Sequence, residues 1–202
     1  MGNSQKFKPT LILIALNVAF YIYTSAVGGD FLTTNVNMLL QYGQVNVYVL
    51  QGEYWRLFTS IFVHADLAHI VGNMLFLLIF GLRSEEMFSL PEYLSIYFLG
   101  GLTGNLLSLL LLPLDTISVG ASGAIFAMFG AAIVYARRSY SQSIIGALIY
   151  ALFLLFLSSG PGVNNFAHIG GLVTGLLIGY VLATRRKPET RYTISYSYST
   201  IP

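Results

Sequence analysis

The chain has 202 residues, of which 55% are apolar and 9% carry a charge, with a formal net charge of +2. A soluble domain carries about 25% charged residues, so this composition excludes an ordinary soluble enzyme and also a disordered chain. The small net charge excludes the basic footprint of a nucleic-acid-binding protein. Because there is no cysteine, disulfide bonds, thiolate metal sites and cysteine nucleophiles are excluded. The apolar residues must therefore face lipid.

Six continuous apolar stretches predict an all-α membrane protein built as a six-transmembrane-helix bundle. A crossing helix needs about 17–25 residues, and the fourth stretch is clearly shorter than the rest. The stretches run over residues 9–27, 67–82, 93–112, 122–136, 142–158 and 167–183.

Positive charge orients the predicted bundle, because cytoplasmic loops carry an excess of Lys and Arg. Nine of the ten cationic residues fall on one side of a six-crossing arrangement, and Arg56 is the exception. We therefore expect six crossings in the cell membrane, with both termini cytoplasmic. The nine residues are Lys6, Lys8, Arg83, Arg137, Arg138, Arg185, Arg186, Lys187 and Arg191.

This arrangement divides the chain into three parts. Residues 1–8 form a cytoplasmic N-terminus, residues 9–184 form the membrane domain with a long interfacial loop over 28–64, and residues 185–202 form a polar cytoplasmic tail. An alternative is that residues 1–26 are a cleaved signal peptide. The apolar run there is longer than the roughly 7–15 residues usual in such peptides, and the charge pattern favours a retained span.

Four polar residues are predicted at one end of the bundle. His64 and His69 lie at the entry to the second span, Ser122 begins the fourth, and His168 lies near the start of the sixth. These three spans run in the same direction, so all four residues gather near the outer surface. The fourth span reaches only about 22 Å across a core of about 30 Å. Ser122 is therefore expected below the outer surface, in a water-filled pit.

Small residues predict that the fourth and sixth spans pack closely, since a four-residue spacing of small side chains lets membrane helices approach. An alternative interpretation is a glycine-packed helix pair with an incidental histidine. The face of the sixth span consists of His168, Gly171, Gly175 and Gly179, and the face of the fourth consists of Gly123, Ala127, Gly130 and Ala131.

Nucleophilic catalysis is the chemistry that these residue types suggest. The Ser122 hydroxyl is a weak nucleophile that needs a base, and neutral His168 could take its proton. Gly120 precedes a serine at a helix N-terminus, where backbone N–H groups favour an anion. His69 and Asn73 lie one turn apart and could donate hydrogen bonds to an oxyanion. Structural roles are the alternatives: an interhelical hydrogen bond for Asn73 and a polar contact for His69.

Other functions fit the sequence less well. No His-Glu-x-x-His motif of a zinc protease is present, and Asp30, Asp66 and Asp115 lie at or beyond span ends, unlike a paired intramembrane aspartyl site. The three histidines with Asp66 could bind zinc, but that leaves Ser122 without a role. A transporter would usually have broken helices at the membrane midplane and internal repeats, and neither feature is evident in the sequence. A non-catalytic membrane protein that binds client helices stays open as a second hypothesis, and a histidine-lined metal transporter as a third.

Four motifs in order resemble those of the rhomboid intramembrane serine proteases, over roughly residues 50–180. They correspond to that family's Trp-Arg pair, His-x4-His-x3-Asn, Gly-x-Ser-Gly and Ala-His-x-x-Gly-x-x-x-Gly. The matching residues are Trp55-Arg56, then His64, His69 and Asn73, then Gly120-Ala121-Ser122-Gly123, and finally Ala167-His168 with Gly171 and Gly175.

The resemblance implies a Ser-His dyad of Ser122 and His168. It also implies an oxyanion hole of His69, Asn73 and the Ser122 N–H, with His64 in a supporting role. Phe126 stands where some members carry Tyr and could stack beneath His168 without donating a hydrogen bond. Substrates would be transmembrane segments of other proteins, cut near their outer end without metal or cofactor. Oligomeric state is not predicted.

Lateral entry from lipid is expected for such substrates. We expect the fifth span and the loop after it to act as the gate. Phe153 and Phe156 are candidate gate residues, with lipid-facing packing as the alternative.

Overall fold

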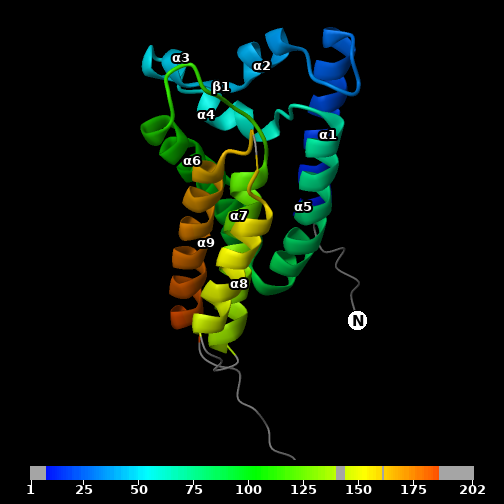
Figure 1. Ribbon diagram of the computed structural model, residues 1–202. Coiled ribbons are helices and arrows are strands. Elements are labelled where there is room, and N and C mark those ends of the chain that lie inside the picture. The colour runs from blue at the N-terminus through cyan, green and yellow to red at the C-terminus, as the bar shows by residue number, and fades with distance from the viewer. Residues whose placement is uncertain (1–7, 140–143, 161, 187–202) are drawn as a thin grey trace, which may run out of the picture.

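Helices form at all six predicted apolar stretches in the computed structural model, which describes residues 8–139, 144–160 and 162–186 (Figure 1). Three parts of the predicted arrangement lie outside the described residues. They are the segment before Lys8, the predicted start of the fifth span at Gln142, and the tail from Lys187 onward. The six helices are α1 (Pro9–Gly28), α5 (Leu67–Met87), α6 (Leu90–Leu111), α7 (Ser122–Ser139), α8 (Ile144–Leu157) and α9 (Asn165–Arg185).

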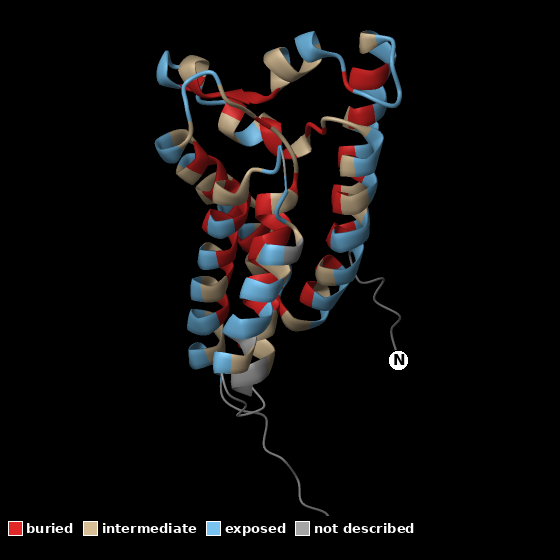
Figure 2. Cartoon of the chain, in the orientation of Figure 1, coloured by how far each residue is buried: buried red, intermediate tan, exposed pale blue. Residues whose placement is uncertain are grey.

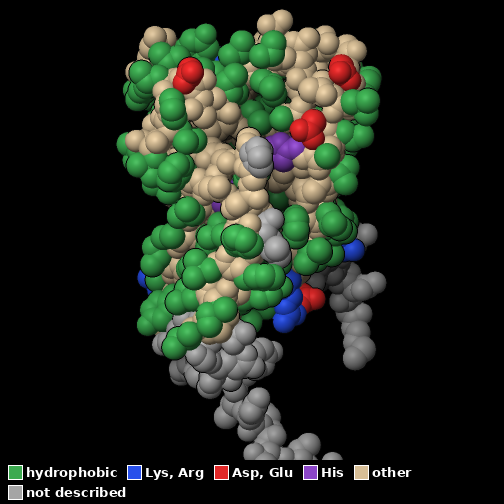
Figure 3. All heavy atoms as spheres, viewed as in Figure 1, with side chains coloured by type: hydrophobic (Ala, Val, Ile, Leu, Met, Phe, Trp, Pro, Cys, Tyr) green, Lys and Arg blue, Asp and Glu red, His purple; other side chains and the backbone are tan. Residues whose placement is uncertain are grey.

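By length and composition, four of the described helices could cross a membrane: α1, α5, α6 and α9, with 20, 21, 22 and 21 residues. The apolar part of α7, Ser122–Ala136, is shorter, and α8 has 14 residues. Hydrophobic side chains cover much of the surface over the long helices on the face seen in Figure 3. The chain is therefore a multi-pass membrane protein, while the count of six crossings stays a prediction.

Helix bounds differ from the apolar stretches where polar residues continue or start a helix. α5 continues beyond the apolar stretch through Arg83 to Met87, because this polar segment contains no Pro or Gly to stop it. α6 begins three residues before the predicted Tyr93, where Ser89 and Glu92 form a capping box that satisfies the first N–H groups. Apolar length alone underestimates such helices.

Short elements replace the predicted loop over residues 28–64, and they gather at one end of the molecule (Figure 1). The two-residue strand β1 pairs antiparallel with β2, which lies just before α7. The fold is therefore not purely α-helical, and this ribbon ties the first loop to the segment leading into Ser122. The elements are α2 (Val36–Tyr42), β1 (Gln44–Val45), α3 (Asn46–Leu50), α4 (Arg56–Thr59), a 3-10 turn (Ser60–Phe62) and β2 (Ile117–Ser118).

α7 is the central helix and packs against α5, α6, α8 and α9. Its side chains are mostly buried, whereas the surrounding helices bury one side and expose the other (Figure 2). The predicted contact of α7 with α9 is confirmed. A Cβ added to Gly171, Gly175 or Gly179 would lie 1.9, 2.0 or 2.5 Å from a carbonyl oxygen of α7. Backbone therefore meets backbone along this interface, which only glycine permits.

We expect Gly175→Ala to lower the thermal unfolding midpoint in detergent, because its Cβ would lie 2.0 Å from the Ala127 carbonyl oxygen. Overpacking of this kind costs about 1–3 kcal/mol. Gly72→Ala is the matched control, since an added Cβ there meets nothing within 4 Å and alanine favours a helix by about 0.5–1 kcal/mol. Equal midpoints for the two variants would contradict the close contact.

Described cationic residues separate between the two ends of the molecule. Thr10 N–H donates to Glu85 at 2.8 Å, which places the start of α1 beside the end of α5. Arg186 after α9 donates to the Met87 carbonyl at 2.6 Å and to the Tyr135 hydroxyl at 3.0 Å. Arg83, Arg185 and Arg186 thus share one end with the start of α1, and Arg56 lies at the other.

Arg56 organises the first loop from within. The side chain is buried, and its Nη1 lies 2.7–3.0 Å from the carbonyl oxygens of Leu40, Gln41 and Gly43. Its Nε donates to Glu53 at 2.6 Å. The guanidinium also lies over the rings of Tyr48 and Trp55, 5.1 and 4.6 Å from their centroids. Arg56 therefore has a structural role in the first loop, which explains why this one cationic residue lies at the end opposite to the other nine in the predicted arrangement.

Arg56→Met should destabilise the first loop, because the three carbonyl oxygens that accept hydrogen bonds from Arg56 would lose their donor. Each buried polar group left unsatisfied lowers the free energy of unfolding by about 1–3 kcal/mol. Faster limited proteolysis within residues 28–64 and a lower unfolding midpoint would report this. Arg83→Met is the control, since Arg83 and its partner Glu86 are both exposed and such pairs contribute about 0–1 kcal/mol. A loop that resists protease equally in both variants would rule out this role for Arg56.

Candidate active site

Ser122 is the first residue of α7 and follows a sharp turn at Gly120. Gly120 has φ +119, a conformation that favours glycine, and an added Cβ would lie 2.8 Å from His69 Nε2. Its N–H donates to the Ser60 carbonyl at 2.9 Å, which fixes the turn to the first loop. The chain therefore enters α7 in one defined path, with Ser122 at the helix N-terminus.

His168 lies in the first turn of α9 and is 5% exposed. The Asn164 side chain caps this helix by accepting from the Ala167 N–H at 3.0 Å. The ring of Phe126 stacks on the imidazole, with 4.5 Å between centroids and 24° between planes. Capping and stacking together restrict both the backbone and the ring of His168.

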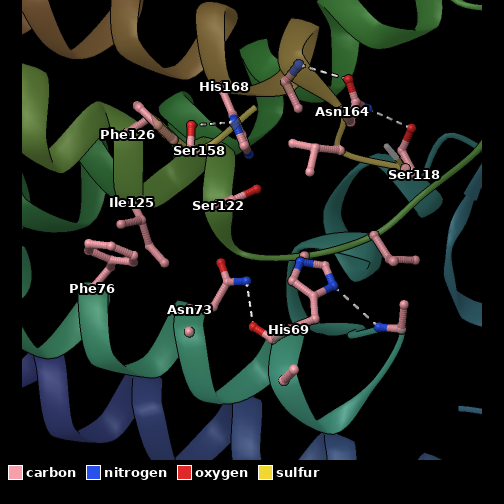
Figure 4. A pocket seen from close by; sticks show the side chains of 18 of the residues that line it. His69, Asn73, Phe76, Ser118, Ser122, Ile125, Phe126, Ser158, Asn164 and His168 are labelled. Carbon is pink, nitrogen blue, oxygen red and sulfur yellow. Dashed lines mark hydrogen bonds between the residues drawn. The ribbon is translucent and has the colours of Figure 1, made fainter. Parts of the chain in front are cut away.

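Ser122 and His168 line the same cavity, of about 710 Å³, although they come from different helices (Figure 4). Among the described residues, no hydrogen bond joins the two side chains. Hydrogen bonds between catalytic groups are often long without a substrate and tighten when one binds. The two residues thus share one cavity, as predicted, without a hydrogen bond between their side chains in the part of the chain that the structure describes.

His69 and Asn73 line this cavity from α5, across from His168 (Figure 4). Asp66 caps α5 by accepting from the His69 N–H at 2.7 Å. The Ala65 N–H approaches His69 Nδ1 at 3.4 Å, so in the neutral ring Nδ1 accepts and Nε2 carries the proton. Asn73 Nδ2 donates one proton to the His69 carbonyl at 2.9 Å and has a second available. Both side chains can therefore donate.

His64 lies behind the cavity and is not among its lining residues. It is fully buried, and its ring meets His69 edge-on with centroids 5.1 Å apart. Burial, with a smaller contribution from His69, lowers the pKa of His64 to about 3, so its ring is neutral at physiological pH. Contact with His69 is how His64 can affect the site.

Asn164 and Ser158 were not recognised from the sequence as site residues. Asn164 Nδ2 lies 2.7 Å from Ser108 Oγ on α6 and 2.8 Å from Ser118 Oγ on β2. These bonds tie the start of α9 to the strand before Ser122. An asparagine just before an apolar helix is a recognisable N-cap signal. Ser158, which follows α8, lies near His168 and has no such signal in the sequence.

The cavity continues from these polar residues into an apolar part between α5, α7 and α8. The α8 residues that line it are Leu154 and, just after the helix, Ser158. Phe153 and Phe156, the predicted gate residues, do not line it and are 53% and 78% exposed. This exposure agrees with the alternative of lipid-facing packing, and a role of these two residues in a gate stays a prediction. The apolar residues that line this part are Phe76, Phe80, Phe129 and Leu154.

A metal centre finds no support in the described part of the chain. No group of three or more His, Cys, Asp or Glu residues there could hold a metal ion. Asp66, the acid considered with the histidines, is used as a helix cap. The cavity instead presents a hydroxyl, an imidazole and two neutral donors.

Comparison with known proteins places the chain among relatives of similar sequence. It is 40% identical over 141 residues to RHOMBOID-like protein 6, mitochondrial, of Arabidopsis thaliana, covering 66% of this chain and 46% of that protein. It is 35% identical over 186 residues to the rhomboid protease GluP of Bacillus subtilis, covering 88% of this chain and 36% of that protein. The putative rhomboid protease YdcA of the same organism is 34% identical over 154 residues, covering 73% and 75%.

The chain thus spans less than half the length of the first two of these three relatives. A family model described as the rhomboid domain matches residues 51–185, which include α5 to α9 and every residue of the candidate site. The chain therefore belongs to the rhomboid family.

Proposed function

We propose that this chain is an intramembrane serine endopeptidase that cleaves transmembrane segments of other membrane proteins near their extracytoplasmic end. One observation carries the proposal: a serine at a helix N-terminus and a restricted histidine line one cavity, with two neutral donors across from them. The family supports it, since relatives are named as rhomboid proteases.

In the proposed first step, the Ser122 oxygen attacks the scissile carbonyl carbon while His168 takes the hydroxyl proton. The electron pair of the carbonyl moves to its oxygen, and this oxyanion is stabilised by His69, Asn73 and the Ser122 N–H. Collapse of the intermediate breaks the C–N bond, and His168 returns the proton to the leaving amine. An acyl-enzyme on Ser122 remains.

Water completes the proposed reaction. His168 takes a proton from the attacking water, a second tetrahedral intermediate forms, and its collapse releases the acid and restores the Ser122 hydroxyl. This chemistry requires a polar cavity that water can enter. The proposed reaction uses no metal or cofactor, because His168 transfers the protons and the donors His69, Asn73 and the Ser122 N–H stabilise the oxyanion.

The proposed substrate enters sideways from the lipid. The apolar part of the cavity between α5, α7 and α8 suits an unwinding transmembrane segment, whose apolar side chains would fill it while its backbone reaches Ser122. α8 is the element proposed to move, since Leu154 contributes to the wall and most of the helix surface is exposed. Gly or Pro in the substrate would make unwinding easier.

The membrane arrangement belongs to the same proposal. Six crossings would place the described end that carries Arg83, Arg185 and Arg186 in the cytoplasm. The candidate site, which lies toward the opposite end, would then be near the outer surface of the cell membrane. Substrates are membrane proteins, and nucleic acid has no part in the proposal.

Ser122→Ala and His168→Ala should each lower cleavage of a single-span model substrate in liposomes by several orders of magnitude, because either change removes the nucleophile or its base. A serine-directed fluorophosphonate should label the wild type and not Ser122→Ala. Ser159→Ala, a nearby exposed serine, serves as the control and should keep labelling. A wild type that binds the substrate without cleaving it would instead favour a non-catalytic client binder.

Asn73→Ala and His69→Ala should each lower kcat by about 100- to 1,000-fold, the usual cost of losing one oxyanion donor. KM should change little, because these donors act on the oxyanion rather than on the bound substrate. Steady-state kinetics in detergent, with unfolding midpoints measured for each variant, would check this. A rise in KM at constant kcat would assign the two residues to substrate binding instead.

A further inference from the structure

His168 has a side-chain partner that the proposed mechanism does not use. Ser158 Oγ lies 3.5 Å from His168 Nδ1, which makes this a long hydrogen bond. Figure 4 shows the two side chains pointing toward each other at the edge of the cavity. Ser158 follows α8 and His168 belongs to α9, so this contact joins two helices at the imidazole itself.

The direction of this hydrogen bond follows from the second contact of Ser158. Its hydroxyl lies 3.0 Å from the Leu155 carbonyl oxygen, which can only accept. A serine hydroxyl has one proton to donate and two lone pairs. With that proton used on the shorter bond to Leu155, Ser158 is left to accept from His168. The proton of the neutral imidazole therefore belongs on Nδ1.

A proton on Nδ1 leaves Nε2 as the basic nitrogen. Phe126 covers one face of the ring, and Ser158 takes the Nδ1 edge. The Nε2 edge is then the one available to the Ser122 hydroxyl across the shared cavity. The opposite tautomer would present an N–H to Ser122 and could not accept its proton.

We propose that Ser158 is a positioning residue that orients His168 and holds it in the tautomer protonated on Nδ1. This inference rests on the proposed function, because it assigns His168 the task of accepting a proton at Nε2. A neutral hydroxyl suits this place, since an unpaired carboxylate would be costly in an apolar interior. It orients the imidazole in the way that an aspartate does in a Ser-His-Asp triad, with a weaker hydrogen bond.

Kinetics of three variants test the role. Ser158→Ala should lower kcat about three- to tenfold with little change in KM, the effect expected for one neutral hydrogen bond. Ser158→Thr, which keeps the hydroxyl, should restore most of the loss. Ser159→Ala is the matched control and should stay within about twofold of the wild type, since its hydroxyl lies 2.8 Å from the same Leu155 carbonyl without reaching His168.

Nitrogen NMR of ¹⁵N-histidine-labelled protein provides a readout that a merely structural role would not change. The chain has three histidines, so the His168 signals can be assigned by their loss in His168→Gln. We expect a protonated Nδ1 and an unprotonated Nε2 in the wild type and in Ser159→Ala. In Ser158→Ala, the signals should move toward a mixture of the two tautomers.

Two outcomes would overturn the inference while leaving the proposed function in place. One is a wild type that cleaves substrate with His168 protonated on Nε2. The other is an active Ser158→Ala whose kcat and tautomer match those of Ser159→Ala. A wild type that neither cleaves substrate nor reacts with the fluorophosphonate would refute the proposed function, and the positioning role with it.

Discussion

Backbone contact between α7 and α9 is the constraint on which the candidate site depends. Glycines on α9 meet carbonyl oxygens of α7 so closely that a single methyl group would separate the helices. Lipid gives two helices little hydrophobic reason to associate, so close packing has to provide the attraction. Because Ser122 begins α7 and His168 lies in the first turn of α9, this packing also brings both residues to one cavity.

Side-chain caps at the helix N-termini also hold the residues around the cavity in place. Asp66 caps α5 just before His69, and Asn164 caps α9 just before His168. Asn164 also bonds to serines of α6 and β2, so the same side chain that starts α9 fixes it to the strand before Ser122. Polar groups that would be costly in lipid are in this way satisfied by one another, and they hold the site in place.

α8 stands apart from this order. Ala151 is its one residue in the described buried core, which it joins in a small cluster with Phe126, Phe129 and Leu172. Most of the remaining described side chains of α8 are exposed or half-buried. Such a helix can move at lower cost than α7, which agrees with its proposed role in admitting substrate. Under the proposed function, Ser158 would connect that movement to the orientation of His168.

The sequence by itself determined the membrane class, the place of the six apolar helices and the small-residue faces of α7 and α9. These features follow from composition and helical period, which are local properties of the chain. It also identified the motifs of the rhomboid family, to which the chain belongs. The residues of the candidate site were predicted from the same motifs, and their catalytic roles stay predictions.

Only the tertiary structure decided which side chains meet across helices. The β1–β2 ribbon joins segments far apart in the chain, and strands of two residues have no periodicity to detect. The rotation of α8 about its axis turns Leu154 and Ser158 to the cavity, whereas the candidate gate residues Phe153 and Phe156 are not among its lining residues. The contact of Ser158 with His168 depends on where one helix ends and the next begins. A sequence pattern does not encode that position, because packing between the helices sets it.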